Sequence, residues 1–365
     1  MDRVIEGEEN PVTRIVALVP AHNESSTIGP TIEALLAQTR PLDLIVVSAN
    51  NCTDDTADVA RSYRYPVVVI DVQGNVHRKS EAMNLAWSIY CKNADIVICS
   101  DADTKLSPHA VCDWEQEFAA RPKLGGSSSK PVMLGTSLLA RIQKAEFTKS
   151  ASISLRRGAT NVISGTGCAY RNNALREIAA RDDQPDGPWS YASAVEDFYL
   201  TYRLREADWR CVVSPTVWCL TGSMPTIKTL WAQRIKWQTG TVQDLLRFGL
   251  NALTWREWLT QAMGLLCIVF WILWPTVEIM AVATGQIHFT WLTVTIFPAF
   301  FSAITLYEAM KIHDKDRWDI VVALSLFPMF LYTWLMMGWV SASWWRILRR
   351  DKSDLWAVQY KAEGI

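Results

Sequence analysis

The chain has 365 residues, of which half are apolar, 18 are Trp and a fifth are charged. This length accommodates one α/β domain of ordinary size and a further segment. The formal net charge of −1 gives no strong field for a nucleic-acid partner, so we expect none. The eight Cys include no Cys-x-x-Cys pair, which favours reduced thiols in a cytosolic domain over disulfides or a zinc site.

The first hundred residues alternate between short apolar runs and amphipathic segments. Strands are predicted over 14–20, 42–48, 66–72 and 95–100, and helices over 25–38, 54–63 and 79–91. This order predicts an α/β fold with a parallel sheet and helices on both faces. No Gly-x-Gly-x-x-Gly motif follows the first strand, which disfavours a dinucleotide-binding fold of the dehydrogenase type.

The next part of the chain is less regular, and the sheet is expected to be mixed, although mainly parallel. The sequence predicts an extended segment over 125–134, a long helix over 137–157 and a strand-like segment over 161–171. A helix over 193–206, a short strand over 210–213 and an amphipathic, Trp- and Gln-rich helix over 226–246 follow.

Three strongly apolar stretches follow, at about 259–283, 289–310 and 320–345. Each is long enough to cross the core of a bilayer, and Trp and Tyr crowd their ends. We therefore expect a multi-pass membrane protein with about three transmembrane helices and lipid as a partner. Glu278 lies inside the first stretch, so it either faces protein or water, or the span ends before it.

The orientation of these stretches is not fixed by the sequence. Residues 311–317 and the tail after Trp345 are both basic, and both would prefer the cytosol. Three full crossings cannot satisfy both if the catalytic domain is also cytosolic. The stretch around Pro328 then forms a bent hairpin, or one segment lies along the interface.

The expected organisation therefore has four parts. Residues 1–225 form a cytosolic catalytic domain, and 226–257 form amphipathic interface helices. Residues 258–346 hold the transmembrane helices, and 347–365 form a basic cytosolic tail.

Two carboxylates, Asp101 and Asp103, stand where the predicted strand 95–100 opens into a loop. Ligands of α/β sheets bind at the carboxyl ends of strands. A hard cation such as Mg²⁺ or Mn²⁺ takes one or two carboxylates and completes its shell with substrate phosphates. A solvated loop start is the structural alternative for an isolated Asp-x-Asp.

Five motifs that occur in a fixed order along the chain argue against this alternative. They are Pro20-Ala21-His22-Asn23-Glu24, Lys79, Asp101-Ala102-Asp103, Glu196-Asp197 and Gln233-Arg234-Ile235-Lys236-Trp237. With them the chain closely resembles the family 2 inverting glycosyltransferases of GT-A fold, over about residues 12–246. Within that family it looks like the membrane-bound synthases, which include cellulose, chitin and hyaluronan synthases.

The resemblance implies a nucleotide-sugar donor, with a UDP-sugar favoured. Asp103 and Asp101 would hold Mn²⁺ or Mg²⁺ at the donor diphosphate, and Asp101 would also contact the sugar of the nucleotide. The other donor-binding residues that it implies are Pro20, Asn23, Glu24, Asn50, Lys79, Arg234 and Lys236.

The resemblance also implies a general base and an acceptor site. A carboxylate must take the proton of the attacking hydroxyl, and Asp197 occupies the position of that base. Direct in-line attack inverts the configuration at the anomeric carbon. Acceptor contacts are implied for Gly165, Thr166, Gly167, Glu196, Gln233 and Trp237. The acceptor itself is a glycan, a lipid-linked molecule or a protein.

The chain departs from the family pattern at three places. Asn50 stands where an acidic residue is usual, and Lys236 stands where Arg is usual and lacks its bidentate fork. No span precedes the catalytic domain, and too few follow it for one chain to enclose a polymer channel. Long processive synthesis would therefore need a homo-oligomer.

Two other functions fit parts of the pattern. A polyprenyl-phosphate glycosyltransferase uses a similar domain, but such enzymes usually lack a Gln-x-x-Arg-Trp type motif. A non-catalytic nucleotide-sugar-binding membrane protein is disfavoured because Asp101, Asp103 and Asp197 are all intact.

Overall fold

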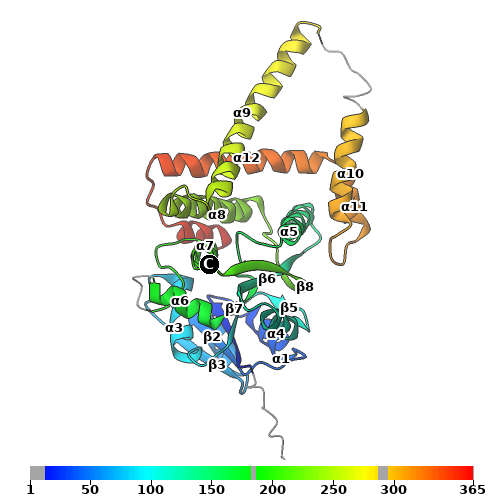
Figure 1. Cartoon of the computed structure of the whole chain (residues 1–365). Helices are drawn as coiled ribbons and strands as arrows, with labels where there is room; N and C mark the ends of the chain where they lie inside the picture. The colour runs from blue at the N-terminus through cyan, green and yellow to red at the C-terminus, as the bar shows by residue number, and fades with distance from the viewer. Residues whose placement is uncertain (1–12, 182–185, 287–294, 365) are drawn as a thin grey trace, which may run out of the picture.

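The computed structural model describes residues 13–181, 186–286 and 295–364. An α/β domain forms the lower part of the molecule, and the C-terminal helices lie on it and project from it (Figure 1).

The sheet has eight strands in the order β3-β2-β1-β4-β7-β6-β8-β5. Its first half consists of the parallel strands β1 (Ile15–Ala21), β2 (Leu44–Asn50), β3 (Val67–Val72) and β4 (Ile96–Ser100). These four strands confirm the parallel arrangement predicted from the apolar runs. β-branched and aliphatic side chains fit strands that are covered on both faces.

Alternate residues of β1 enter two separate cores. Ile15, Ala17 and Val19 pack with α1 (Ile28–Leu36), α2 (Thr56–Arg61) and α4 (Ala110–Ala120). Val16 and Leu18 pack on the opposite face with α3 (Arg78–Tyr90), α6 (Asn172–Arg181) and α7 (Glu196–Glu206). Because successive side chains of a strand point to opposite faces, this alternation fixes the three-layer arrangement.

The second half of the sheet mixes strand directions. β7 (Gly167–Arg171) runs antiparallel to β4 and to β6 (Leu124–Leu134), whereas β6 and β8 (Arg210–Gly222) are parallel. The two-residue strand β5 (Lys105–Leu106) closes the edge against β8. The mixed, mainly parallel sheet is therefore the observed one, and it resembles the expected GT-A core.

Three element boundaries differ from the expectation. The segment 161–171 is a strand only from Gly167, and the helix expected from Ser193 begins at Glu196. β8 continues to Gly222 instead of ending at Val213. An irregular register after Val213 lets β8 rejoin β6 at Trp218, and Val217 and Cys219 then enter the core.

Two long helices lie above the sheet. α5 (Leu138–Arg157) begins at Ser137, whose hydroxyl accepts from the backbone N–H of Ala140, and ends at Gly158 in the left-handed conformation. α8 (Ile227–Phe248) begins with a capping box between Thr226 and Thr229. It packs against α12 (Phe327–Leu348) and α13 (Leu355–Glu363).

The remaining C-terminal helices are α9 (Trp255–Ala283), α10 (Phe297–Ala309) and α11 (Arg317–Leu324). Within the described residues, α9 is the only single helix long and apolar enough to cross a membrane; α11 and α12 qualify only as one unit, bent by 71°. The expected three straight crossings are therefore not present there. The bend next to Pro328 agrees with the expected break in the last apolar stretch. Part of the second apolar stretch, residues 289–294, lies outside the described residues.

α10 and α11 are tied to α5 by ion pairs. Arg141 Nη2 lies 2.7 Å from Asp316 Oδ2, and Arg141 Nη1 lies 2.8 Å from Asp319 Oδ1. Glu308 in the last turn of α10 lies 3.5 Å from Arg156. Figure 1 shows α9 projecting away from the α/β domain, α10 returning towards it, and α12 lying across the base of α9.

Candidate active site

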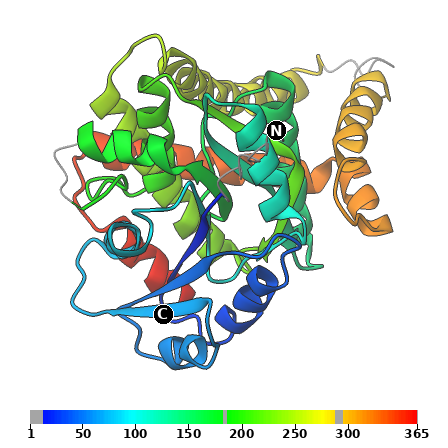
Figure 2. The ribbon, with the colours of Figure 1, turned by 60° about the horizontal axis from the view of Figure 1, so that its bottom comes forward.

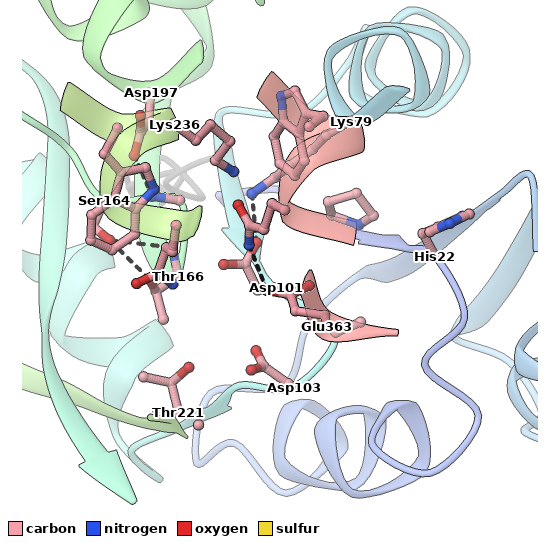
Figure 3. A pocket seen from close by; sticks show the side chains of 18 of the residues that line it. His22, Lys79, Asp101, Asp103, Ser164, Thr166, Asp197, Thr221, Lys236 and Glu363 are labelled. Atoms are coloured by element: carbon pink, nitrogen blue, oxygen red, sulfur yellow. Dashed lines mark hydrogen bonds and ion pairs between the residues drawn. The ribbon is translucent and has the colours of Figure 1, made fainter. Parts of the chain in front are cut away.

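A cavity of about 390 Å³ opens at the carboxyl ends of β1, β2 and β4 (Figure 3). Of the residues selected from the sequence, it is lined by Pro20, Glu24, Asn50, Lys79, Asp101, Asp103, Gly165, Thr166, Glu196, Asp197, Gln233, Lys236 and Trp237. We call it the donor cavity. Residues that are far apart in the chain meet there because parallel strands end at the same edge of a sheet.

The two acids after β4 form one side of the donor cavity. Between them, Ala102 is buried, and its carbonyl accepts a hydrogen bond of 2.8 Å from the hydroxyl of Thr31. This fixes the turn, so both carboxylates face the cavity (Figure 3). Burial and the charge of Asp101 raise the pKa of Asp103. A cation at this position would offset both the burial of the Asp103 carboxylate and its repulsion by Asp101.

Lys79 connects these acids to the Glu-Asp pair on α7. Its ammonium lies 2.6 Å from Asp101 Oδ1 and 3.4 Å from Glu196 Oε1. Burial lowers the pKa of Lys79, but the charges of Asp101 and Glu196 outweigh it and hold the pKa well above its usual value. Gly165 leaves room for this ammonium, because a Cβ there would lie 3.0 Å from Lys79 Nζ.

Asp197 lies in the first turn of α7, across the donor cavity from Asp103 (Figure 3). Its Oδ1 accepts from the N–H of Phe198 at 2.7 Å, and its Oδ2 from the N–H of Gly165 at 3.4 Å. Burial, followed by the charge of Glu196, raises the pKa of Asp197 to about 6. A carboxylate with this pKa is ionised near neutral pH and can accept a proton.

α8 supplies a further wall through Gln233, Lys236 and Trp237. Lys236 is buried, which lowers its pKa to about 8, and its ammonium lies 3.2 Å from the centre of the Trp356 ring. Arg234 does not line the donor cavity. It forms a two-pronged ion pair with Glu146 on α5, at 3.0 and 2.8 Å.

Two other selected residues lie outside the lining of the donor cavity. Asn23 joins the loops after β1 and β2, since its Oδ1 accepts from the N–H of Thr53 at 2.8 Å. Gly167 lies within the sheet, where a Cβ would be 2.9 Å from Leu106. Both residues shape the walls without contacting the space inside.

Glu24 and Asn50 lie together in the lining of the donor cavity, at the ends of β1 and β2. Burial, opposed by a hydrogen bond from Thr27, raises the pKa of Glu24 to about 7. Asn50 is fixed by Asn75, whose amide donates to Asn50 Oδ1 at 2.6 Å. His22 also lines the cavity, with its Nδ1 2.7 Å from the carbonyl of Asn50.

The C-terminal tail contains site residues that sequence reasoning missed. The expected basic tail instead forms α13, and Trp356, Gln359, Tyr360 and Glu363 line the donor cavity. Figure 2 shows α13, in red, beside the blue strands of the amino-terminal half. The spacing i, i+3, i+4, i+7 after the N-cap Asp354 is the signal that could have revealed this face.

Contacts with the amino-terminal half hold α13 in place. The rings of Tyr360 and His22 lie 5.0 Å apart, and Arg78 pairs with Asp354 and covers the Tyr360 ring at 5.3 Å. Gln359 is buried, and its Oε1 has no hydrogen-bond partner among the described residues. This face of α13 therefore presents the ring of Tyr360 to the donor cavity, and Gln359 keeps a buried oxygen without a partner behind it.

The donor cavity thus has an acidic floor, the buried Lys236, the partly buried Lys79 and an opposing carboxylate. This arrangement can hold a diphosphate, with or through a cation, while Asp197 faces the other end of the bound molecule. Among the described residues, no group of three His, Cys, Asp or Glu side chains could hold a metal by itself. Two carboxylates completed by substrate phosphates fit Mg²⁺ or Mn²⁺ better than a site made of protein alone.

Comparisons with known proteins show the family and the fold of the chain. The family model described as "Glycosyltransferase like family 2" matches residues 12–240. Poly-beta-1,6-N-acetyl-D-glucosamine synthase of Staphylococcus epidermidis is 25% identical over 319 residues, which cover 83% of this chain and 74% of that protein. The enzyme of the same name from Staphylococcus aureus strain COL is 28% identical over 240 residues, 64% of this chain but only 56% of that protein.

Among solved structures, the chain is similar to the mannosyltransferase PcManGT from Pyrobaculum calidifontis, described in complex with GDP-Man and Mn²⁺. The TM-score is 0.61 at 18% identity, and the match covers 93% of this chain and 88% of that one. This likeness supports the fold. Because the family model spans well over half of the residues, the chain belongs to the family 2 glycosyltransferases.

Proposed function

We propose that the protein is a membrane-bound inverting glycosyltransferase that moves a sugar from a UDP-sugar to a hydroxyl of an acceptor. The observation that carries this proposal is the shared donor cavity, in which Asp101 and Asp103 face Asp197 and Lys79 lies between them. A binding protein without catalysis would not need a carboxylate with a raised pKa opposite the diphosphate position.

The donor diphosphate would lie over Asp101 and Asp103, within reach of Lys79 and Lys236. The carboxylates of Asp101 and Asp103 would hold Mn²⁺ or Mg²⁺, which would stabilise the negative charge of the departing diphosphate. The two ammonium groups add positive charge in a water-poor site, where it is worth more than in bulk water. Glu24 and Asn50 would contact the nucleoside, and α13 would cover it.

Asp197 would act as the general base. Its carboxylate takes the proton of the acceptor hydroxyl while that oxygen forms a bond to the anomeric carbon. The bond between this carbon and the diphosphate oxygen breaks, and the nucleoside diphosphate leaves with the electron pair. Attack from the side opposite the leaving group inverts the configuration.

The names of the relatives suggest the first donor to test. The two staphylococcal relatives are synthases of an N-acetylglucosamine polymer, so UDP-N-acetylglucosamine is the first candidate. Detergent-purified protein would be incubated with Mn²⁺ and a panel of UDP- and GDP-sugars, and the released nucleoside diphosphate would be measured. Release from none of these donors would contradict the proposed function.

Membrane attachment would be through α9. The helix has 29 residues, which at 1.5 Å per residue gives about 43 Å, more than the roughly 30 Å of a hydrocarbon core. Its most apolar window is not buried within the chain at all. Lipid is the medium in which such an exposed surface is stable. Glu278 is five residues from the end of α9, where the interface would lie.

The contacts on either side of α9 support two crossings. Glu308, at the end of α10, and Asp319 are both ion-paired to α5 of the catalytic domain, and α13 lies in the donor cavity. The chain before α9 and the chain after α10 would then lie on one side, and an even number of crossings would follow. α9 would leave, and the chain that ends in α10 would return, since the 13 residues of α10 alone are too short to cross. α12 would lie along the interface. The basic segment 311–317 and the basic tail would then both be cytosolic.

A further inference from the structure

A second cavity, of about 430 Å³, is lined by residues of α5 and α8 and by Asp197. Five residues line both cavities, and the catalytic-base candidate is among them: Phe147, Ser164, Val195, Asp197 and Trp237. A molecule in the second cavity can therefore present an atom to Asp197 while a donor occupies the first. We call this second cavity the acceptor cleft.

Hydroxyl groups dominate the polar lining of the acceptor cleft. Ser150 and Ser154 lie four residues apart on one face of α5, and Thr241 faces them from α8. None of these three hydroxyls has a hydrogen-bond partner among the described residues. Each can donate to and accept from a ligand hydroxyl, which is how proteins recognise sugars.

One cation of the acceptor cleft is already paired with an acid. Arg234 and Glu146 are paired with each other, and Glu146 also accepts a hydrogen bond of 2.7 Å from the hydroxyl of Tyr332. The second lining cation, Arg157, is the last residue of α5 and is exposed. A phosphate that entered the cleft next to Trp237 would therefore have to compete with Glu146 for Arg234.

Two aromatic rings stand where the cavities join. Phe147 and Trp237 lie 6.2 Å apart and edge to face, and the guanidinium of Arg234 lies 4.8 Å from the centre of the Trp237 ring. The apolar faces of a sugar ring can pack on such rings while its hydroxyls reach the serines. This would orient a sugar entering from the acceptor cleft towards Asp197.

We propose that the acceptor cleft binds the uncharged end of a glycan acceptor and delivers one hydroxyl of it to Asp197. This inference rests on the proposed glycosyl transfer and adds the acceptor class to it. The volume is in the range of about 300–1,000 Å³ that small-molecule sites occupy, so it holds a short glycan end and not a long chain. The glycan can come from solution or from a lipid-linked molecule, because both carry the same uncharged sugar end.

The test fills the acceptor cleft without touching the donor cavity. Ser154→Leu places an apolar side chain in the cleft, and Ser150→Ala removes one free hydroxyl. Ser152→Leu is the matched control, because it makes the same change on the same helix at a position that lines neither cavity. Binding of UDP with Mn²⁺ and acceptor-free release of UDP from UDP-N-acetylglucosamine report on the donor cavity in every variant.

Transfer would be measured to three probes: a free β-1,6-linked N-acetylglucosamine tetrasaccharide, the same glycan on a lipid in vesicles, and polyprenyl phosphate in vesicles. We expect Ser154→Leu to lower kcat/KM for a glycan probe by about tenfold or more, and Ser150→Ala by about fivefold, through KM. UDP binding should stay within about twofold of wild type, and Ser152→Leu should match wild type. Whether the free or the lipid-borne glycan is used identifies the source.

Three results would overturn this inference: an unchanged glycan KM in Ser154→Leu, transfer by wild type to none of the glycan probes, or transfer to polyprenyl phosphate alone. If wild-type protein neither binds UDP nor releases it from any donor, the proposed function fails instead. The two failures are therefore distinguishable, because the donor-side measurements do not depend on the acceptor cleft.

Discussion

Lys79 and Asp197 are the two central ionisable residues of the donor cavity, and each is partly buried. Lys79 is stabilised by Asp101 and Glu196, so its positive charge is held in place before any diphosphate arrives. Asp197 accepts hydrogen bonds from two backbone N–H groups, which orients its carboxylate towards both cavities. Side chains fixed in this way need little rearrangement when a substrate binds.

Asp197→Asn should separate binding from transfer. The amide keeps the shape but cannot accept the proton, so transfer should fall by about 10²–10⁴-fold while UDP still binds with Mn²⁺. Isothermal titration with UDP and a transfer assay measure the two quantities. Asp103→Asn serves for comparison and should weaken both. Transfer by Asp197→Asn at the wild-type rate would show that Asp197 is not the base.

The transfer rate should depend on pH through Asp197. Because the pKa of this group is raised to about 6, the rate should increase with an acid limb near pH 6 and level off above it. The effect on stability has the opposite sign. A folded pKa above the unfolded value of about 3.9 means that protonation stabilises the fold, and this contribution is lost as pH rises from about 4 to 6.

A rate profile in buffers from pH 5 to 8, at saturating donor, checks this expectation. The limb should be absent from the residual activity of Asp197→Asn. A limb that persists unchanged in that variant would assign it to another group, such as Glu24 or Asp244, whose pKa values are both raised to about 7.

Residue motifs predicted most of the lining of the donor cavity, but not the direction of every side chain. Asp101, Asp103, Lys79 and Asp197 each follow a strand or begin a helix, so their meeting could be expected from topology alone. Arg234 was expected at the diphosphate but faces Glu146, because one residue along a helix turns a side chain by about 100° away from its neighbours Gln233 and Lys236. A motif gives residue types and not the direction of each side chain.

At the scale of helices and strands, α13 is the helix that was not predicted from the sequence. It has nine residues, too few to be a stable helix alone, and its polar face points into the donor cavity instead of towards solvent. Its position depends on tertiary contacts with His22 and Arg78, far away in sequence. The first four strands, in contrast, were predictable because short apolar runs bounded by turn residues are typical of buried strands.

Removing α13 should weaken nucleotide binding. Truncation after Asp351, or Tyr360→Ala, removes the ring that packs on His22 and should raise the Kd for UDP by about tenfold, since one packed aromatic contributes on the order of 1–1.5 kcal/mol. Lys361→Ala, on the exposed side of the same helix, is the control. Titration calorimetry measures the change. Tighter binding after truncation would mean that α13 obstructs the donor cavity instead of completing it.

At the scale of the whole molecule, α5 connects the α/β domain to α10 and α11. One face of this helix lines the acceptor cleft, and Arg141, Lys144 and Arg156 tie the helix to α10 and α11. Among the described residues only α9 is long and apolar enough to cross a membrane alone, although the sequence predicts about three such helices. Hydropathy measures composition, and composition does not distinguish a spanning helix from α12, which lies across α9. The proposed return of the chain rests on the ion pairs to α5.

The proposed two crossings predict a labelling pattern. In a background with Cys52, Cys112 and Cys267 replaced by Ser, the variants Asp314→Cys and Ser353→Cys should react with an impermeant maleimide from the catalytic side. Gly285→Cys, just after α9, should react only from the opposite side, because α9 separates it from the catalytic domain. Sealed vesicles of known orientation provide the measurement. Labelling of residues 314 and 285 from the same side would rule out the two crossings.

The position of Glu363 has a practical consequence for anyone producing this enzyme. Residues fused after Ile365 start three positions beyond Glu363, whose side chain lines the donor cavity, so an affinity tag there would compete with the incoming nucleotide. At the other end of the domain, β1 begins at Ile15, at the edge of the sheet opposite the donor cavity, so a tag on that side would avoid this competition. Assays of an enzyme purified by its carboxyl end would therefore understate its turnover.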